Sequence, residues 1–343
     1  MTQTAATVAP PRYAIQRWGR LSISLTGFAS VLAVALIFVP VVLSLNTTQK
    51  MTSLLILVLL AVMWNALAGY GGLVSVGQQA FIGLGAYGTV WLTHHNMKPY
   101  QAMVLAALFC GAIAVPLSFV VLRFRGAAFA IGMWVVAEVA AIFVSFDQSL
   151  GAGTGTSLIE LNYYSPDQRQ EYTYWLTLGM AVFFLGLLFV LLRSRLGASL
   201  QAIRDDEEAA ASLGVRVVAV KRVLFVIAAA GCGAAGAMTL ANTLFIEPTS
   251  IFGVDWTAYM IFMVLVGGLG TFEGPIVGAL VLFAVQTEWA DNGVWYLVGL
   301  GAAAMLFALL IPRGIWGTLE EKFGFRVMPV GYRLRRLQEK VPS

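Results

Sequence analysis

The chain has 343 residues, of which 59% are hydrophobic and only 11% are charged, and its net charge at pH 7 is +4. Soluble domains carry roughly 25% charged residues, so this composition excludes a water-soluble globular protein and predicts a chain solvated by lipid. The two cysteines lie in apolar stretches and the two histidines, His94 and His95, are adjacent. Neither pair has the spacing of metal ligands, so we expect no metal site, no disulfide and no cofactor in this chain.

Apolar segments run through most of the chain and predict an all-α polytopic membrane protein with about ten transmembrane helices. A bilayer core about 30 Å thick needs roughly 20 apolar residues per helix, so each such segment is a candidate span. The first segment ends without a small-residue cleavage site, and we therefore expect it to be retained as a span rather than removed as a secretion signal. The expected spans lie near residues 21–45, 51–69, 73–94, 101–122, 127–146, 174–193, 221–243, 257–271, 275–289 and 295–312.

The basic residues are distributed unevenly between the two sides that this threading creates. With both termini in the cytoplasm, 18 of the 21 lysines and arginines fall in predicted inner segments, and only Lys50, Lys98 and Arg169 fall outside. This is the positive-inside pattern of inner-membrane proteins. The chain then divides into a cytoplasmic N-terminal segment, a membrane domain and a basic cytoplasmic tail, which are residues 1–20, 21–312 and 313–343. We expect the tail to face anionic lipid headgroups rather than nucleic acid.

The longest basic inner segment, residues 194–220, carries the clearest local signal for a helix. Asp205 can cap the helix, and Glu208 lies three residues later, as in a capping box. Gly214 suits the left-handed residue that follows a last helical turn. These residues predict a short cytoplasmic helix over 206–213.

The middle of this expected helix is formed by three small side chains, Ala209, Ala210 and Ala211. Small residues let a helix lie close against another protein, and acidic residues in its first turn complement the helix dipole. The segment therefore has the shape of a docking helix. A solvated loop that is merely helical is the alternative that these residues leave open.

Four stretches of the chain resemble one family of transport proteins. Glu208-Ala-Ala followed by Gly214 is similar to the signature that permeases of ATP-binding-cassette (ABC) importers present to their ATPase. The longer stretch over residues 202–215, followed by Lys221, resembles the LivM-type permeases of branched-chain amino acid transporters. Three further stretches agree with that family in order and spacing, and they are Gly69–Tyr87, Gly267–Ala279 and Ile311–Gly317.

The resemblance implies a set of partners and a division of labour. A LivM-type permease works with a second, related permease, two ATPase subunits and a periplasmic solute-binding protein in the bacterial inner membrane. The residues that would couple this chain to its ATPase are Asp205, Glu208, Ala209, Ala210 and Gly214. The sequence contains no Gly-x-x-x-x-Gly-Lys-Ser/Thr loop to hold ATP phosphates. We therefore expect ATP and Mg on the partner subunits and no enzymatic activity in this chain.

Two glycine clusters, 69–72 and 267–270, interrupt the hydrophobic pattern between expected spans. Paired interruptions of this kind indicate a solute path, because the freed backbone groups need polar partners that lipid does not offer. Close helix packing through small residues is the alternative. The path candidates in and beside the clusters are Gly71, Gly72, Ser75, Gln78, Gln79, Gly267, Gly268, Gly270 and Thr271.

Glu138 lies near the middle of the expected span 127–146. A carboxylate at that depth costs roughly 2.5 to 3.5 kcal/mol for insertion. We therefore expect Glu138 to face the interior of the bundle or water, where it stabilises the bundle near the solute path, with an internal hydrogen bond as the alternative.

No residue of the chain selects the substrate. Members of the resembling family carry leucine, isoleucine and valine, other apolar amino acids, or urea and small amides, and selection resides largely in the binding protein. The sequence thus predicts an importer of branched-chain or related amino acids, with urea, small amides or other small polar solutes as alternatives. An ATP-independent secondary transporter is a further alternative, and it predicts transport by this chain alone.

Overall fold

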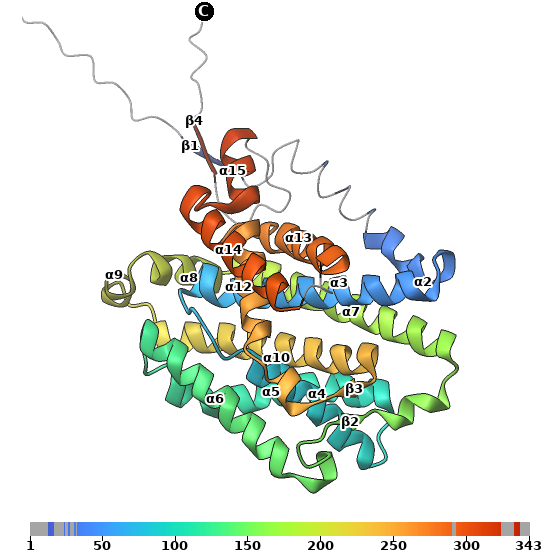
Figure 1. The fold of residues 1–343 in the computed structure, drawn as a ribbon. Coiled ribbons are helices and arrows are strands. Elements are labelled where there is room, and N and C mark those ends of the chain that lie inside the picture. The colour runs from blue at the N-terminus through green and yellow to red at the C-terminus, as the bar shows by residue number, and fades with distance from the viewer. Residues whose placement is uncertain are drawn as a thin grey trace, which may run out of the picture.

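The computed structural model describes residues 13–16, 24, 27, 31, 33–289, 293–323 and 333–336, and in them long helices pack side by side (Figure 1). The helices are α2 (Val39–Val42), α3 (Leu45–Asn65), the π-helical turn η1 (Ala66–Tyr70), α4 (Gln79–His94), α5 (Pro99–Val121), α6 (Ala127–Phe146), η2 (Gln148–Leu150), η3 (Ile159–Tyr163), α7 (Pro166–Arg193), α8 (Arg195–Asp205), α9 (Glu207–Ser212), α10 (Val217–Thr243), α11 (Pro248–Ile251), α12 (Asp255–Gly267), α13 (Gly274–Trp289), α14 (Val294–Leu310) and α15 (Gly314–Phe323). Four short strands form two antiparallel ribbons, β1 (Tyr13–Gln16) with β4 (Arg333–Arg336) and β2 (Thr156–Ser157) with β3 (Phe245–Ile246).

Seven helical segments of the described residues are long and apolar enough to cross a bilayer, fewer than the ten or so expected from the sequence. Nine of the 25 residues of the expected span 21–45 lie outside the described residues, and helix α2 within it has only four residues. Residues 73–78 of the expected span 73–94 are not helical, so α4 has only 16 residues, and α13 also has 16. The seven segments are Leu45–Tyr70, Pro99–Val121, Ala127–Phe146, Pro166–Arg193, Val217–Thr243, Pro248–Gly267 and Trp295–Lys322.

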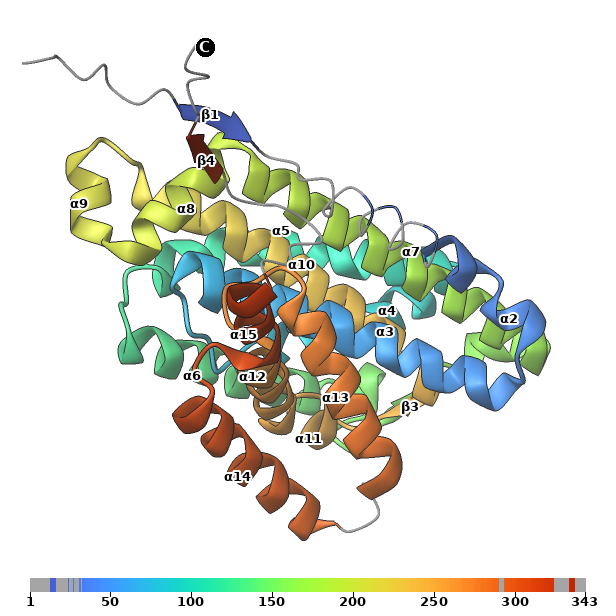
Figure 2. The same ribbon diagram turned by 90° about the horizontal axis from the view of Figure 1, so that it is seen from above.

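Helices α3 and α10 form the centre of the bundle, and α6 and α14 lie at its periphery (Figure 2). Helix α10 contacts α3, α4, α5 and α7. Its glycines and alanines allow this, because small residues let helix backbones approach closely. At Gly85 of α4, for example, a Cβ atom would overlap the backbone of Gly233 in α10.

The loops at the ends of the long helices form two groups. At one end, the turns that follow η1, α5 and α12 come together with α8 and α9. At the opposite end β2 pairs with β3, the start of α3 contacts the end of α10, and the Tyr100 hydroxyl donates a 3.2 Å hydrogen bond to the Arg169 carbonyl oxygen. Lys50, Lys98 and Arg169, the basic residues that the charge pattern separates from the rest, all belong to this opposite end.

Candidate functional site

The short helix α9 begins one residue later than expected and is capped by a different residue. Asp206 is extended (φ −158°, ψ 108°), and its carboxylate accepts hydrogen bonds from the backbone nitrogens of Glu208 and Ala209, both at 2.9 Å. Asp206 is therefore the N-cap. The prediction of Asp205 as the cap is wrong, because the chain is still helical there and Asp205 is the last residue of α8. Gly214 has φ +87°, as predicted for the residue after the last turn.

The surface of α9 is only partly the one that the sequence predicted. Glu208 and Ala209 are exposed, but Ala210 is buried against the rest of the chain. Ala210 is thus wrong as a docking residue, and it packs α9 onto the bundle instead. Sequence reasoning missed Leu213, which is 83% exposed at the end of α9. No sequence signal sets Leu213 apart, because the same loop also contains Leu196, Leu200 and Ile203.

Glu207, the first residue of α9, fastens this helix to the membrane domain. Its carboxylate lies 2.6 Å from the Lys221 ammonium nitrogen of α10 and 3.6 Å from the Arg125 Nε atom in the turn between α5 and α6. Lys221 is buried, with 9% of its surface exposed. Charge-assisted hydrogen bonds of this kind are the strong ones, so α9 is held in a fixed position relative to α10.

The two glycine clusters, 69–72 and 267–270, contact each other beside the last turn of α8. A Cβ atom on Gly69 would lie 2.6 Å from the Gly270 backbone nitrogen, so only glycine fits at this contact. Asn65, which the sequence analysis missed, joins the two segments. Its Oδ1 atom accepts a 2.9 Å hydrogen bond from the Gly270 nitrogen, and its Nδ2 atom donates one of 2.8 Å to the Thr271 carbonyl oxygen. We call this contact between residues 65–72 and 268–274 the glycine junction.

The glycine junction also contacts α8 and the start of α15. Arg204 in the last turn of α8 donates a 3.1 Å hydrogen bond from Nη1 to the Gly69 carbonyl oxygen. A Cβ atom on Gly268 would lie 3.0 Å from the Arg313 carbonyl oxygen and 3.2 Å from the Gly317 nitrogen. All four stretches that carry the family resemblance are therefore brought together at one place.

The other polar path candidates lie in the irregular segment between η1 and α4. Ser75, Gln78 and Gln79 are fully buried. Gln79 Oε1 accepts a 2.5 Å hydrogen bond from the Thr257 hydroxyl of α12, which links the start of α4 to α12. Gln78 donates to the Ser75 hydroxyl, while its own Oε1 atom is buried without a hydrogen-bond partner among the described residues.

Glu138 lies on the outer face of α6, contrary to expectation. The residue is exposed within this chain, and its Oε1 atom accepts a 3.0 Å hydrogen bond from the Trp134 indole nitrogen one turn earlier. The prediction that Glu138 points into the bundle of this chain is wrong. The position of Glu138 along α6 follows from the sequence, but the face of α6 on which it lies depends on how the helix packs.

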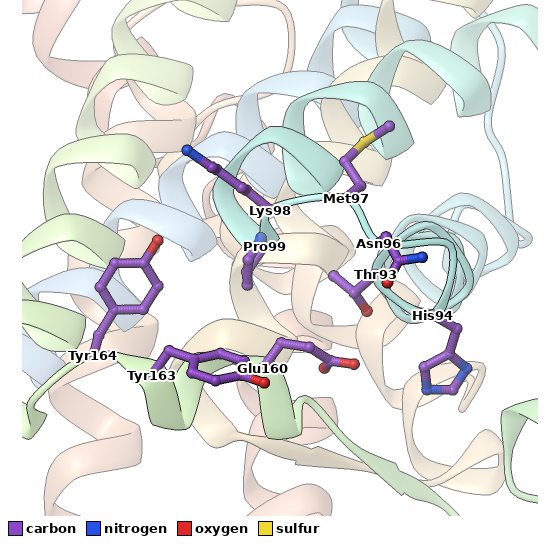
Figure 3. Close-up of a pocket in the computed structure, with 9 residues that line it drawn as sticks. All are labelled: Thr93, His94, Asn96, Met97, Lys98, Pro99, Glu160, Tyr163 and Tyr164. Atoms are coloured by element: carbon purple, nitrogen blue, oxygen red, sulfur yellow. The ribbon is translucent and has the colours of Figure 1, made fainter.

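A polar cavity of about 610 Å³ lies at the end of the bundle opposite α9 (Figure 3). The Glu160 carboxylate points toward Thr93 and Asn96, whereas the Lys98 side chain points to the other side of the cavity. The lining residues are Thr93, His94, Asn96, Met97, Lys98, Pro99, Glu160, Tyr163 and Tyr164.

Comparisons with known proteins identify the family of the chain. Residues 46–311 match the family model described as branched-chain amino acid transport system, permease component. The chain is 26% identical over 336 residues to the high-affinity branched-chain amino acid transport system permease protein LivM of Escherichia coli (strain K12), which covers 90% of this chain and 79% of the relative. It is 27% identical over 315 residues to the protein of the same description from Salmonella typhimurium (strain LT2), with coverages of 84% and 74%.

A solved structure, described as an inward-facing metal-chelate type ABC transporter, superposes with a TM-score of 0.46 at 15% identity and covers 88% of this chain and 100% of that one. The family match spans most of the chain and includes five of the seven candidate membrane spans in full. The chain is a multi-pass protein of the bacterial inner membrane, and it belongs to the LivM-type family of branched-chain amino acid transport permeases.

Proposed function

We propose that the chain is the permease subunit of an ABC importer that carries branched-chain or related amino acids across the inner membrane. Separate subunits hydrolyse the ATP, and this chain is a membrane subunit without catalytic activity. The observation that carries the proposal is the hydrogen-bonded connection from the exposed helix α9, through Arg204, to two broken membrane segments. An ATPase attached to α9 can move those segments, and a transporter without an ATPase has no use for such an attachment.

The proposed topology has ten crossings, with both termini, α8 and α9 in the cytoplasm. The grouping of the loops supports it, because the basic residues at the α9 end far outnumber those at the opposite end. The ribbon of β1 and β4 supports it too, since it places the two ends of the chain side by side and therefore requires an even number of crossings.

Cysteine labelling tests this topology. In Leu213→Cys and Tyr163→Cys, which alter side chains that are 83% and 89% exposed at opposite ends of the bundle, a membrane-impermeant maleimide is expected to reach only position 163 from the periplasm. The native Cys110 and Cys232 are buried, so their background labelling is low. Labelling of position 213 from the periplasm would refute the proposed orientation.

The ATPase subunits are proposed to dock on the outward face of α9. Glu208 and Ala209 form its exposed first turns, Leu213 presents an apolar side chain, and Gly214 lets the chain turn away after it. Glu207 and Asp206 hold this surface in place from behind.

The second, related permease is proposed to cover the face of α6 that carries Glu138. A carboxylate at mid-depth costs roughly 2.5 to 3.5 kcal/mol against lipid tails, and the Trp134 indole nitrogen supplies it with one hydrogen-bond donor only. Only 22% of the apolar stretch of α6 is buried within this chain. A protein partner with donors at this depth satisfies Glu138, and the solute path then runs between the two permeases. Ser75, Gln78 and Gln79 are fully buried in this chain, so we propose that they reach this path only when the segment between η1 and α4 moves.

The periplasmic solute-binding protein is proposed to dock at the end opposite α9. The cavity of Figure 3 offers this partner both charges on one surface, from Lys98 and Glu160. Lipid is the remaining partner, and it covers the apolar outer faces of the bundle.

Reconstitution of the complete complex tests the proposed function. Proteoliposomes that contain this chain, the second permease and the ATPase subunits, supplied with binding protein and radiolabelled leucine, isoleucine and valine, are expected to accumulate label only when ATP is present. If urea or small amides accumulate and these amino acids do not, the substrate of the importer is urea or a small amide. Nucleotide-independent accumulation by this chain alone, driven by an ion gradient, would refute the importer.

A further inference from the structure

Arg204 lies between the proposed ATPase-docking helix and the broken membrane segments. It belongs to the last turn of α8, three residues before α9 begins at Glu207. Its Nη1 atom reaches the Gly69 carbonyl oxygen at 3.1 Å, while Nε and Nη2 reach Asp205 Oδ1 at 3.3 and 3.2 Å. One planar guanidinium thus holds a backbone group of the membrane domain and a carboxylate of the cytoplasmic loop together.

The Gly69 carbonyl is a favourable acceptor for a cation. It lies in the last turn of the 26-residue helical segment Leu45–Tyr70, where carbonyl oxygens have no partner further along the helix. The negative end of the helix dipole lies at the same place and favours a guanidinium over a neutral group. A Cβ atom on Gly270 would lie 3.1 Å from Arg204 Nη1, so the glycine leaves the space that the guanidinium occupies.

The contact of Arg204 extends to the second broken segment through Asn65. Asn65 is buried and uses both ends of its amide on the backbone of Gly270 and Thr271. The helix that Arg204 contacts at its end is therefore bonded to the turn between α12 and α13. A displacement of α8 therefore acts on both segments, because Arg204 is bonded to the first and Asn65 bonds the first to the second.

We propose that Arg204 is the positioning residue through which movement of the coupling helix α9 reaches the two broken membrane segments, with Asp205 orienting its guanidinium and Asn65 passing the displacement on. This inference rests on the proposed function. It assigns to Asp205 the orientation of Arg204, in place of the capping role that the sequence predicted. Arginine is needed because a lysine ammonium cannot hold two acceptors in one plane.

The experiment measures uptake and ATP hydrolysis in the same proteoliposomes that contain the complete complex. The variants are Arg204→Gln, Arg204→Lys and Asp205→Asn. The control is Arg195→Gln, which removes another exposed arginine, the first residue of the same helix. Radiolabelled leucine, isoleucine and valine are the probes. Copurification of the ATPase subunits with each variant reports whether the complex assembles.

Arg204→Gln is expected to lower the amount of amino acid accumulated per ATP hydrolysed by about tenfold, which is within the usual range of coupling between two sites. ATP hydrolysis and copurification stay within about twofold of wild type, as does every property of the Arg195→Gln control. Arg204→Lys is expected to restore part of the ratio. A merely structural role would instead lower the yield of the complex and both activities together.

The inference is overturned if Arg204→Gln accumulates as much amino acid per ATP hydrolysed as the wild type does. If the Arg204→Gln complex does not assemble, the test uses Arg204→Lys and Asp205→Asn instead. A wild-type ratio of amino acid accumulated to ATP hydrolysed in both of these variants also overturns the inference. The proposed function fails separately, if the wild-type complex accumulates none of these amino acids in the presence of ATP.

Discussion

Replacing Glu208 by lysine is expected to detach the ATPase subunits from the membrane domain. Glu208 is exposed on α9, and its side chain is free of the packing that buries Ala210 two residues later. A reversed charge in a protein interface places like charges together and costs several kcal/mol. We expect ATPase copurification to fall by more than tenfold, which corresponds to at least about 1.4 kcal/mol, and ATP-driven uptake to be lost with it.

The matched control is Asp167→Lys, which makes the same change of charge in the first turn of α7, at the opposite end of the bundle. It is expected to leave ATPase binding unchanged. Both variants keep their helix, because the cap of α9 is supplied by Asp206 and that of α7 by Ser165. Normal ATPase binding by Glu208→Lys would place the docking surface elsewhere on the chain.

Local signals in the sequence predicted the elements of this site better than their partners. The helix α9 and the left-handed Gly214 follow from capping and turn chemistry over ten residues, and the structure confirms them with the cap displaced by one position. That displacement arises because Asp205 and Asp206 are chemically identical, and only the end of α8 decides which of them is extended. Local chemistry therefore fixed the type of the element but not its first residue.

Long-range contacts could not be predicted from one sequence. Asn65 bonds to Thr271 across 206 residues, and no motif in the chain links the two positions. The sequence predicted that both glycine clusters matter, but not that they touch. Glu138 shows the same limit, because its depth follows from the length of the span, whereas the face it occupies depends on how α6 packs.

Removing Glu207 from its ion pair with Lys221 is expected to destabilise the membrane domain more than removing Lys221 does. In Glu207→Gln the buried Lys221 ammonium loses the carboxylate oxygen that lies 2.6 Å away. Removing one partner of a fully buried pair costs roughly 3–5 kcal/mol. Glu207 is 28% exposed, so we expect about 2 kcal/mol, seen as a fall of roughly 4 °C in the melting temperature of the purified chain in detergent.

The reciprocal variant, Lys221→Met, is expected to cost less than about 1 kcal/mol, because the carboxylate it leaves behind is 28% exposed and is not a fully buried unpaired charge. Glu207 then keeps Arg125, whose Nε lies 3.6 Å away, and its remaining contact with water. The double variant Glu207→Gln with Lys221→Met is expected to melt near Lys221→Met, since the unpaired ammonium is gone. Equal destabilisation by the two single variants would mean that the stability of α9 does not depend on the burial of Lys221.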